Sequence, residues 1–122
     1  MATHKFTDQR LSIELVENEK SVELIWGGRS TAREPSTFIA PIVEQALSLA
    51  ATSSRELILD FRELEFFNSS TMSPMVRLLQ QARDRNARVR LIYDADLHWQ
   101  ALSFAALEVF HSDADGIIIE GR

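Results

Sequence analysis

The residues best suited to chemistry in this chain lie in one short segment, 66–74, which follows a predicted strand and precedes a predicted helix. Five hydroxyl or amide side chains occur there within six positions: Asn68, Ser69, Ser70, Thr71 and Ser73. Ser, Thr and Asn are the side chains that most often cap the start of a helix. Because one cap needs one side chain, the segment holds more polar groups than capping requires.

A hydroxyl at the start of a helix is also a suitable phosphate acceptor. The first N–H groups of a helix lack helical partners and carry a partial positive charge, so the fold tolerates a phosphate there. Phosphorylation adds up to about two negative charges, and an unpaired charge enclosed in an interface is costly. Phosphorylation of this segment would therefore regulate the binding of a partner and leave the fold largely intact.

A second polar segment follows the predicted strand 89–93, where Asp94, Asp96 and His98 alternate along the chain. An extended segment would present all three on one side, as metal ligands or as the acid pair of a phosphatase. Such a phosphatase also needs a lysine later in the chain, and the only lysines are Lys5 and Lys20. Acids in the first turn of a helix also offset its dipole, so we expect Asp96 to cap a helix.

Composition excludes several classes of function. The 122 residues include no cysteine, which rules out disulfides, thiolate catalysis and cysteine-bound zinc. Only four glycines are present, and their positions fit neither the Walker loop nor the dinucleotide fingerprint. The net charge of −5 argues against nucleic acid as a partner. We expect no cofactor, no metal and no membrane span, and a cytoplasmic location.

Periodicity predicts one α/β domain at 11–122 after a polar segment at 1–10. Strands at 11–15 and 22–26 form a hairpin, and helices then alternate with strands: helix 36–51, strand 56–61, helix 70–86, strand 89–93, helix 96–107 and strand 117–119. This ββαβαβαβ order implies a mixed, mostly parallel sheet. The unbroken apolar run Leu57-Ile58-Leu59 predicts a strand covered on both faces.

The segment Phe67-Asn68-Ser69-Ser70 between a strand and a helix resembles the STAS fold of anti-sigma factor antagonists. Their second helix opens with Asp-Ser-Ser-Gly and is phosphorylated on the first serine. A closer resemblance, over residues 11–120, is to the SiaC-type regulatory phosphoproteins, a STAS-like bacterial family. It is carried by Gly28-Arg29-Ser30, Glu34-Pro35, Phe38 and Pro41, by Phe67-Asn68-Ser69-Ser70-Thr71, and by Tyr93, Asp94 and Asp96.

The resemblance implies a non-enzymatic signalling switch. Ser69 stands where the SiaC-type family carries its phosphorylated threonine. Because serine and threonine are exchanged between positions 69 and 71, Thr71 and Ser70 are second choices as acceptor. The residues expected to contact a kinase or another partner are Asn68, Ser70, Thr71, Arg29, Ser30, Glu34, Tyr93 and Asp94.

The resemblance also implies the partners. A serine/threonine kinase of the histidine-kinase-like fold phosphorylates such proteins, and a PP2C-type phosphatase reverses the reaction. The unphosphorylated form binds a downstream target, which in some systems is a diguanylate cyclase. Asn68 replaces the aspartate of the anti-sigma factor antagonists, which favours the SiaC-type interpretation. An anti-sigma factor antagonist and, from another class, a small metal-dependent phosphatase or hydrolase remain as alternatives.

Overall fold

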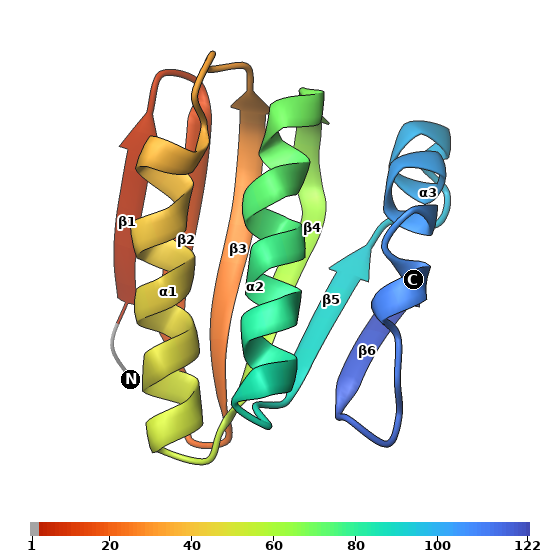
Figure 1. Cartoon of the computed structure of the whole chain (residues 1–122). Coiled ribbons are helices and arrows are strands. Elements are labelled where there is room, and N and C mark those ends of the chain that lie inside the picture. Colours follow the sequence, from red (N-terminus) through yellow and green to blue (C-terminus); the bar gives the residue numbers. More distant parts are fainter. Residues whose placement is uncertain (1–2) are drawn as a thin grey trace.

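The computed structural model describes residues 3–122, which form a six-stranded sheet with helices (Figure 1). The strands lie side by side in the order in which they occur in the chain. They are β1 (Thr3–Asp8), β2 (Leu11–Glu17), β3 (Ser21–Ser30), β4 (Glu56–Phe67), β5 (Val89–Tyr93) and β6 (Ile117–Gly121). The helices are α1 (Ser36–Thr52), α2 (Met72–Asp84) and α3 (His98–Ala105), with 3-10 turns η1 (Ser69–Thr71) and η2 (Glu108–Phe110).

Strand β1 is the element that the sequence pattern missed. Residues 1–10 were expected to be a polar segment outside the fold, but Thr3–Asp8 pairs antiparallel with β2, and Phe6 lies opposite Ile13. Phe6 is the one large apolar side chain in β1, so the alternation that marks a strand is weak. A polar strand is typical of the edge of a sheet, where water reaches the unpaired backbone groups.

Strands β3 to β6 pair in parallel, and a helical connection joins each to the next. Such crossovers are right-handed in nearly all proteins. Because each crossover here leads to the neighbouring strand in the same direction, α1 and α2 lie on the same face of the sheet (Figure 1). The expected mixed, mostly parallel α/β sheet is confirmed. No helix within residues 3–122 is long and apolar enough to cross a membrane.

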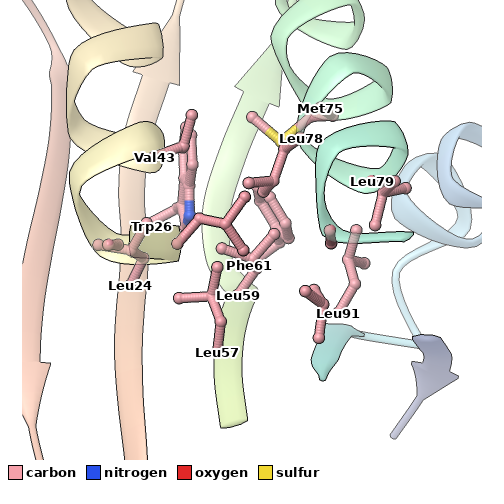
Figure 2. Close-up of a cluster of buried hydrophobic side chains, with 14 of the residues drawn as sticks. Leu24, Trp26, Val43, Leu57, Leu59, Phe61, Met75, Leu78, Leu79 and Leu91 are labelled. Carbon is pink, nitrogen blue, oxygen red and sulfur yellow. The ribbon is translucent and has the colours of Figure 1, made fainter. Parts of the chain in front are cut away.

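The core fills the space between the sheet and the helices (Figure 2). Trp26 of β3, Phe61 of β4 and Phe104 of α3 are each at most 1% exposed and form a continuous aromatic row. Their ring centroids lie 4.8 Å apart for Trp26–Phe61 and 4.9 Å for Phe61–Phe104. Leu24, Leu57, Leu59, Leu91, Val43, Met75, Leu78 and Leu79 pack around this row.

The opposite face of the sheet corrects one prediction. Leu57 and Leu59 are fully buried, but Ile58 between them is only half-buried, so β4 is covered on one face there and not on both. The unbroken apolar run reflects an isoleucine on the open face. Charged side chains surround it: Arg90 forms ion pairs with Glu56 and Glu120 across three strands, at 3.4 and 2.7 Å.

The two ends of the sheet have different roles. Strands β3, β4 and β5 all finish at one end, uppermost in Figure 1, which we call the carboxyl edge; it comprises residues 29–35, 66–73 and 93–98. The opposite end, the amino edge, comprises residues 17–21, 48–56 and 84–88. In open sheets with parallel strands, ligands and partners typically meet the carboxyl edge.

Candidate functional site

The turn η1, which leads into α2, is capped by the side chain of Asn68. Its backbone is extended, at φ −83° and ψ 167°, and its Oδ1 accepts a hydrogen bond of 3.2 Å from the backbone N–H of Thr71. The turn η1 follows, and α2 begins at Met72, two residues later than predicted. Pro74 falls in the first turn of α2, where its missing N–H needs no helical partner.

The hydroxyl of Thr71 links this cap to the end of β3. Thr71 Oγ1 donates to Asn68 Oδ1 at 2.8 Å and lies 2.7 Å from Ser30 Oγ. Since Thr71 has only one hydroxyl proton, Ser30 must be the donor to Thr71. Asn68 Nδ2 in turn donates to the carbonyl of Ala32 at 2.8 Å. We call these four residues the carboxyl-edge network.

The network divides the hydroxyl groups of the segment into two kinds. Thr71 and Ser30 are each 2% exposed and are used within the fold, whereas Ser69 and Ser70 are exposed. Ser30 and Thr71, two of the residues predicted to contact a kinase or partner, are thus buried, and their hydroxyl groups bond to each other. The surplus of polar groups in the segment is partly structural: Asn68 and Thr71 hold two loops together.

The surface around Ser69 includes an aromatic residue that the sequence reasoning missed. Phe66 is 38% exposed, and the guanidinium carbon of Arg29 lies 5.0 Å from the centre of its ring. Phe66 and Arg29 are paired in the register of β3 and β4, which brings the two loops together. Glu34, predicted for the same surface, is exposed on the loop before α1. The sequence does contain a signal for Phe66. Phe66 and Phe67 are adjacent, and neighbouring side chains of a strand point to opposite faces, so one of the two rings had to face outward.

Gln100 of α3 positions the loop after β5. It is fully buried, and its Nε2 donates to the carbonyls of Phe61 and Leu64, at 2.7 and 2.9 Å. Its Oε1 accepts a hydrogen bond of 2.8 Å from the backbone N–H of Asp94. A glutamine in a helix usually faces solvent, so no sequence pattern singled out Gln100.

The loop after β5 also corrects the prediction that Asp96 caps a helix. Helix α3 begins at His98, its N-cap residue is Leu97, and no side chain bonds to that cap. Asp94 Oδ1 instead accepts a hydrogen bond of 2.9 Å from the N–H of Asp96, a local turn. Tyr93, which precedes the loop, is half-buried, and its ring stacks on that of Phe104 with 5.6 Å between the ring centroids.

Asp94, Asp96 and His98 do not converge on one point. Within residues 3–122 no group of three or more histidine, aspartate or glutamate side chains is placed to hold a metal ion. The carboxylate of Asp94 accepts the hydrogen bond from Asp96 N described above, while Asp96 and His98 are exposed. The arrangement offers no support for the metal-dependent phosphatase or hydrolase considered from the sequence.

Comparisons with known proteins support the fold. No family model and no curated protein sequence matches the chain. Similar solved structures include an anti-sigma factor antagonist from Mycobacterium paratuberculosis, with a TM-score of 0.56 and 12% identity, covering 88% of this chain and 85% of that one. Another is an uncharacterized DUF3478-family protein with a SpoIIAA-like fold from Shewanella loihica PV-4, with a TM-score of 0.53, 14% identity and coverage of 96% and 92%.

At these identities the likeness concerns the fold alone. Both alignments span most of each chain, so one architecture accounts for nearly all of the described residues. The finer resemblance to the SiaC-type proteins stays a prediction from the sequence. The chain has the SpoIIAA-like fold of STAS proteins.

Proposed function

We propose that this chain is a phosphorylation-controlled binding module without catalysis of its own, and that the hydroxyl of Ser69 is the acceptor. The observation that carries the proposal is the division of hydroxyl groups at the start of α2. Ser69 is exposed, whereas Thr71, a second choice from the sequence, is buried and bonded to Ser30 and Asn68. Ser70, also exposed, is the remaining alternative.

The position of Ser69 allows a phosphate without unfolding. The first hydrogen bond of the turn is donated by Thr71 N to Asn68 O, so Ser69 lies before the first backbone donor of η1, and its carbonyl accepts from Met72 N. A negative charge near a helix start is favourable by about 0.3–1 kcal/mol at an exposed position. The adjacent carboxyl-edge network contains only neutral groups, so added charge breaks no ion pair within it.

A phosphate at Ser69 would act on whatever covers the carboxyl edge. The exposed ring of Phe66, the guanidinium of Arg29 and the carboxylate of Glu34 give this surface one apolar and two charged contacts. A partner fitted to the neutral serine would enclose up to about two added negative charges. An enclosed charge without a counter-charge costs several kcal/mol, enough for a large loss of affinity.

The resemblance of the sequence to the SiaC-type proteins supports a particular set of partners. These are a serine/threonine kinase of the histidine-kinase-like fold, a PP2C-type phosphatase and a downstream target such as a diguanylate cyclase. The fold shared with an anti-sigma factor antagonist favours a second candidate, in which the partner is an anti-sigma factor. Both candidates use the same acceptor and differ only in the protein that docks.

The acceptor is tested by incubating the chain with its kinase and ATP and locating the phosphate by peptide mass spectrometry. The kinases encoded beside the gene are the first to assay. Ser69→Ala should abolish incorporation, whereas Ser70→Ala, which removes the neighbouring exposed hydroxyl, should leave it unchanged. Phosphate found only outside residues 69–71 would refute the proposed switch.

The effect on binding is tested with the captured partner. Ser69→Asp should weaken docking by about tenfold or more relative to Ser69→Ala, and Ser70→Asp serves as a control for charge at the same edge. Identification of the captured protein distinguishes a cyclase from an anti-sigma factor. Equal affinity of the Ser69→Asp and Ser69→Ala variants would show that charge at this position does not control binding.

A further inference from the structure

A pocket lies at the amino edge, at the other end of the sheet from Ser69. It is formed where α1 turns into β4 and α2 turns into β5, and its volume is about 250 Å³. We call it the arginine pocket, because three of the residues that line it are arginines: Arg55, Arg85 and Arg88. The remaining lining residues are small or polar: Ala50, Ala51, Ser54, Asn86 and Ala87.

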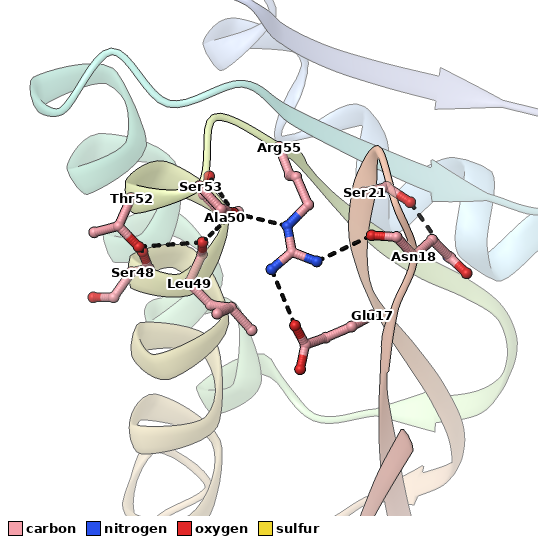
Figure 3. Close-up of polar contacts among 9 residues, drawn as sticks. All are labelled: Glu17, Asn18, Ser21, Ser48, Leu49, Ala50, Thr52, Ser53 and Arg55. Carbon is pink, nitrogen blue, oxygen red and sulfur yellow. Dashed lines mark hydrogen bonds and ion pairs between the residues drawn. The ribbon is translucent and has the colours of Figure 1, made fainter. Parts of the chain in front are cut away.

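Arg55, one of the lining residues, is held in place by polar contacts with its neighbours (Figure 3). Its three nitrogen atoms are all engaged: Nη2 with Glu17 Oε1 at 3.0 Å, Nη1 with the carbonyl of Asn18 at 3.0 Å, and Nε with Ser53 Oγ at 2.7 Å. Its side chain is only 16% exposed. The charge of Arg55 is therefore balanced by Glu17, and its conformation is set before any ligand arrives.

Arg85 and Arg88 are in a different state. Each donates a single hydrogen bond to a neutral oxygen: Arg85 Nη1 to Ser48 Oγ at 3.3 Å, and Arg88 Nη2 to the carbonyl of Ser54 at 3.0 Å. Neither takes part in an ion pair within residues 3–122. Arg85 and Arg88 therefore keep free N–H donors beside the arginine pocket, in a chain whose net charge is −5; Arg85 also lines a neighbouring pocket with Glu44 and Asp84.

Neutralising the ends of the helices does not account for these arginines. Both helices end at this edge, but three carbonyls in the last turn of each already accept hydrogen bonds from backbone N–H groups. Arg55 N donates to Ala50 O and Ala87 N to Ala82 O, each at 2.9 Å, across left-handed residues at Ser54 and Asn86. Each helix end contributes only about half a negative charge, so the two unpaired guanidinium groups leave a net positive pocket.

We propose that the arginine pocket binds a small phosphoryl anion. Guanidinium groups recognise phosphate through charge-assisted and often bidentate hydrogen bonds. A volume of about 250 Å³ is below the range of about 300–1,000 Å³ usual for larger ligands. Free phosphate or a small phosphate monoester therefore fits the pocket better than a dinucleotide does. Because the pocket lies at the other end of the sheet, this proposal does not depend on phosphorylation of Ser69.

The test is a titration of the ¹⁵N-labelled full chain, followed by amide NMR. The separate ligands are inorganic phosphate, glycerol phosphate as a small monoester, and sodium chloride at matched ionic strength. We expect saturable shifts at Ala51, Ser54, Asn86 and Ala87 with either phosphate, and no saturable shift with chloride. Tighter binding of one phosphate than the other identifies free phosphate or a monoester as the preferred form.

Variants assign the effect to the two arginines. Arg85→Gln and Arg88→Gln should each weaken binding by about tenfold, because each removes a charged donor at the pocket. Arg77→Gln removes the same charge from an exposed position near the middle of α2, away from the pocket lining, and should leave binding unchanged. All three side chains are exposed, so the variants should fold. Shifts that chloride reproduces, or equal binding by the Arg85→Gln, Arg88→Gln and Arg77→Gln variants, would overturn the proposal.

Discussion

The two edges of the sheet are held together by different chemistry. At the carboxyl edge, Asn68, Thr71 and Ser30 join the ends of β3 and β4 through hydrogen bonds between neutral groups. At the amino edge, Arg55 and Glu17 join the start of β4 to the end of β2 through an ion pair. Both sets of contacts do the same thing: each holds two loops in place relative to each other.

The difference bears on what each edge can sense. Hydrogen bonds between hydroxyl and amide groups change little with salt or with pH near neutrality. A surface that must respond to one phosphate benefits from such a background, because the carboxyl-edge network itself holds no charge that compensates the new one. Ion pairs are screened by salt, and the amino edge also carries Arg85 and Arg88, whose guanidinium groups form no ion pair within residues 3–122. The comparison predicts that the two edges differ most in their response to salt.

Removal of the Asn68 side chain should have the largest effect on stability. Asn68→Ala removes the cap of η1, the turn that leads into α2, and leaves the buried hydroxyl of Thr71 without its acceptor. We expect a loss of about 2–3 kcal/mol in the free energy of unfolding, from cap and unsatisfied hydroxyl together. Urea denaturation measures it. Ser70→Ala, an exposed neighbour, should change stability by less than about 0.5 kcal/mol.

Thr71→Val should have the next largest effect, because it keeps the shape of the side chain and removes its hydroxyl. Ser30 then loses its acceptor and Asn68 loses a donor, and we expect a loss of about 1–2 kcal/mol. Ser30→Ala combined with Thr71→Val should cost less than the sum of the single variants, since no buried hydroxyl is left unpaired. Additive losses in urea denaturation would show that the two hydroxyls do not act as a pair.

Much of the fold could be predicted from the sequence because its signals are local. Alternation marks β2 and β3, and an apolar stripe at helical spacing marks α1 and α2. Strand β1 lacks that alternation, and its pairing with β2 depends on the edge of a sheet that local pattern does not reveal. The prediction that β4 is covered on both faces failed for a related reason. Ile58 is apolar but only half-buried, and the sequence pattern does not show which apolar side chains are covered.

The candidate site was predictable only in part. The cluster of hydroxyl groups could be found, because it lies in one segment. Which of them are buried could not, since that depends on Ser30, 41 residues away from Thr71 in the sequence. Gln100 and Phe66 were missed because the partners of Gln100, and Arg29 beside Phe66, come from other parts of the chain.

Salt sharpens the comparison between the edges. Arg55→Gln removes the ion pair with Glu17 and should cost about 1 kcal/mol at low salt. The Debye length falls from about 10 Å at about 0.1 M salt to about 3 Å at about 1 M. The difference between wild type and Arg55→Gln should therefore shrink as sodium chloride is raised, in phosphate-free buffer. The loss caused by Thr71→Val should stay constant, and a matching salt dependence would remove the distinction between the edges.

The smallest expected effect concerns the open face of the sheet, and there the variable to change is pH, because Asp60 is a titratable group. Burial alone would raise the pKa of Asp60, but hydrogen bonds from the side chain and backbone of Arg62, with its charge, outweigh burial and lower that pKa. A lowered folded-state pKa gives stability that is present above the unfolded value of about 3.9 and is lost as pH falls through the folded value.

Arg62→Gln should raise the pKa of Asp60, because burial remains while the charge and the side-chain bonds are removed. The carboxyl carbon of Asp60, followed by NMR during acid titration, should then titrate at a higher pH than in the wild type. Acid unfolding should also begin at a higher pH. The carboxyl-edge network contains no ionisable side chain, so the Thr71→Val variant should show the wild-type midpoint for Asp60. An unchanged midpoint in Arg62→Gln would mean that Arg62 does not set the charge of this face.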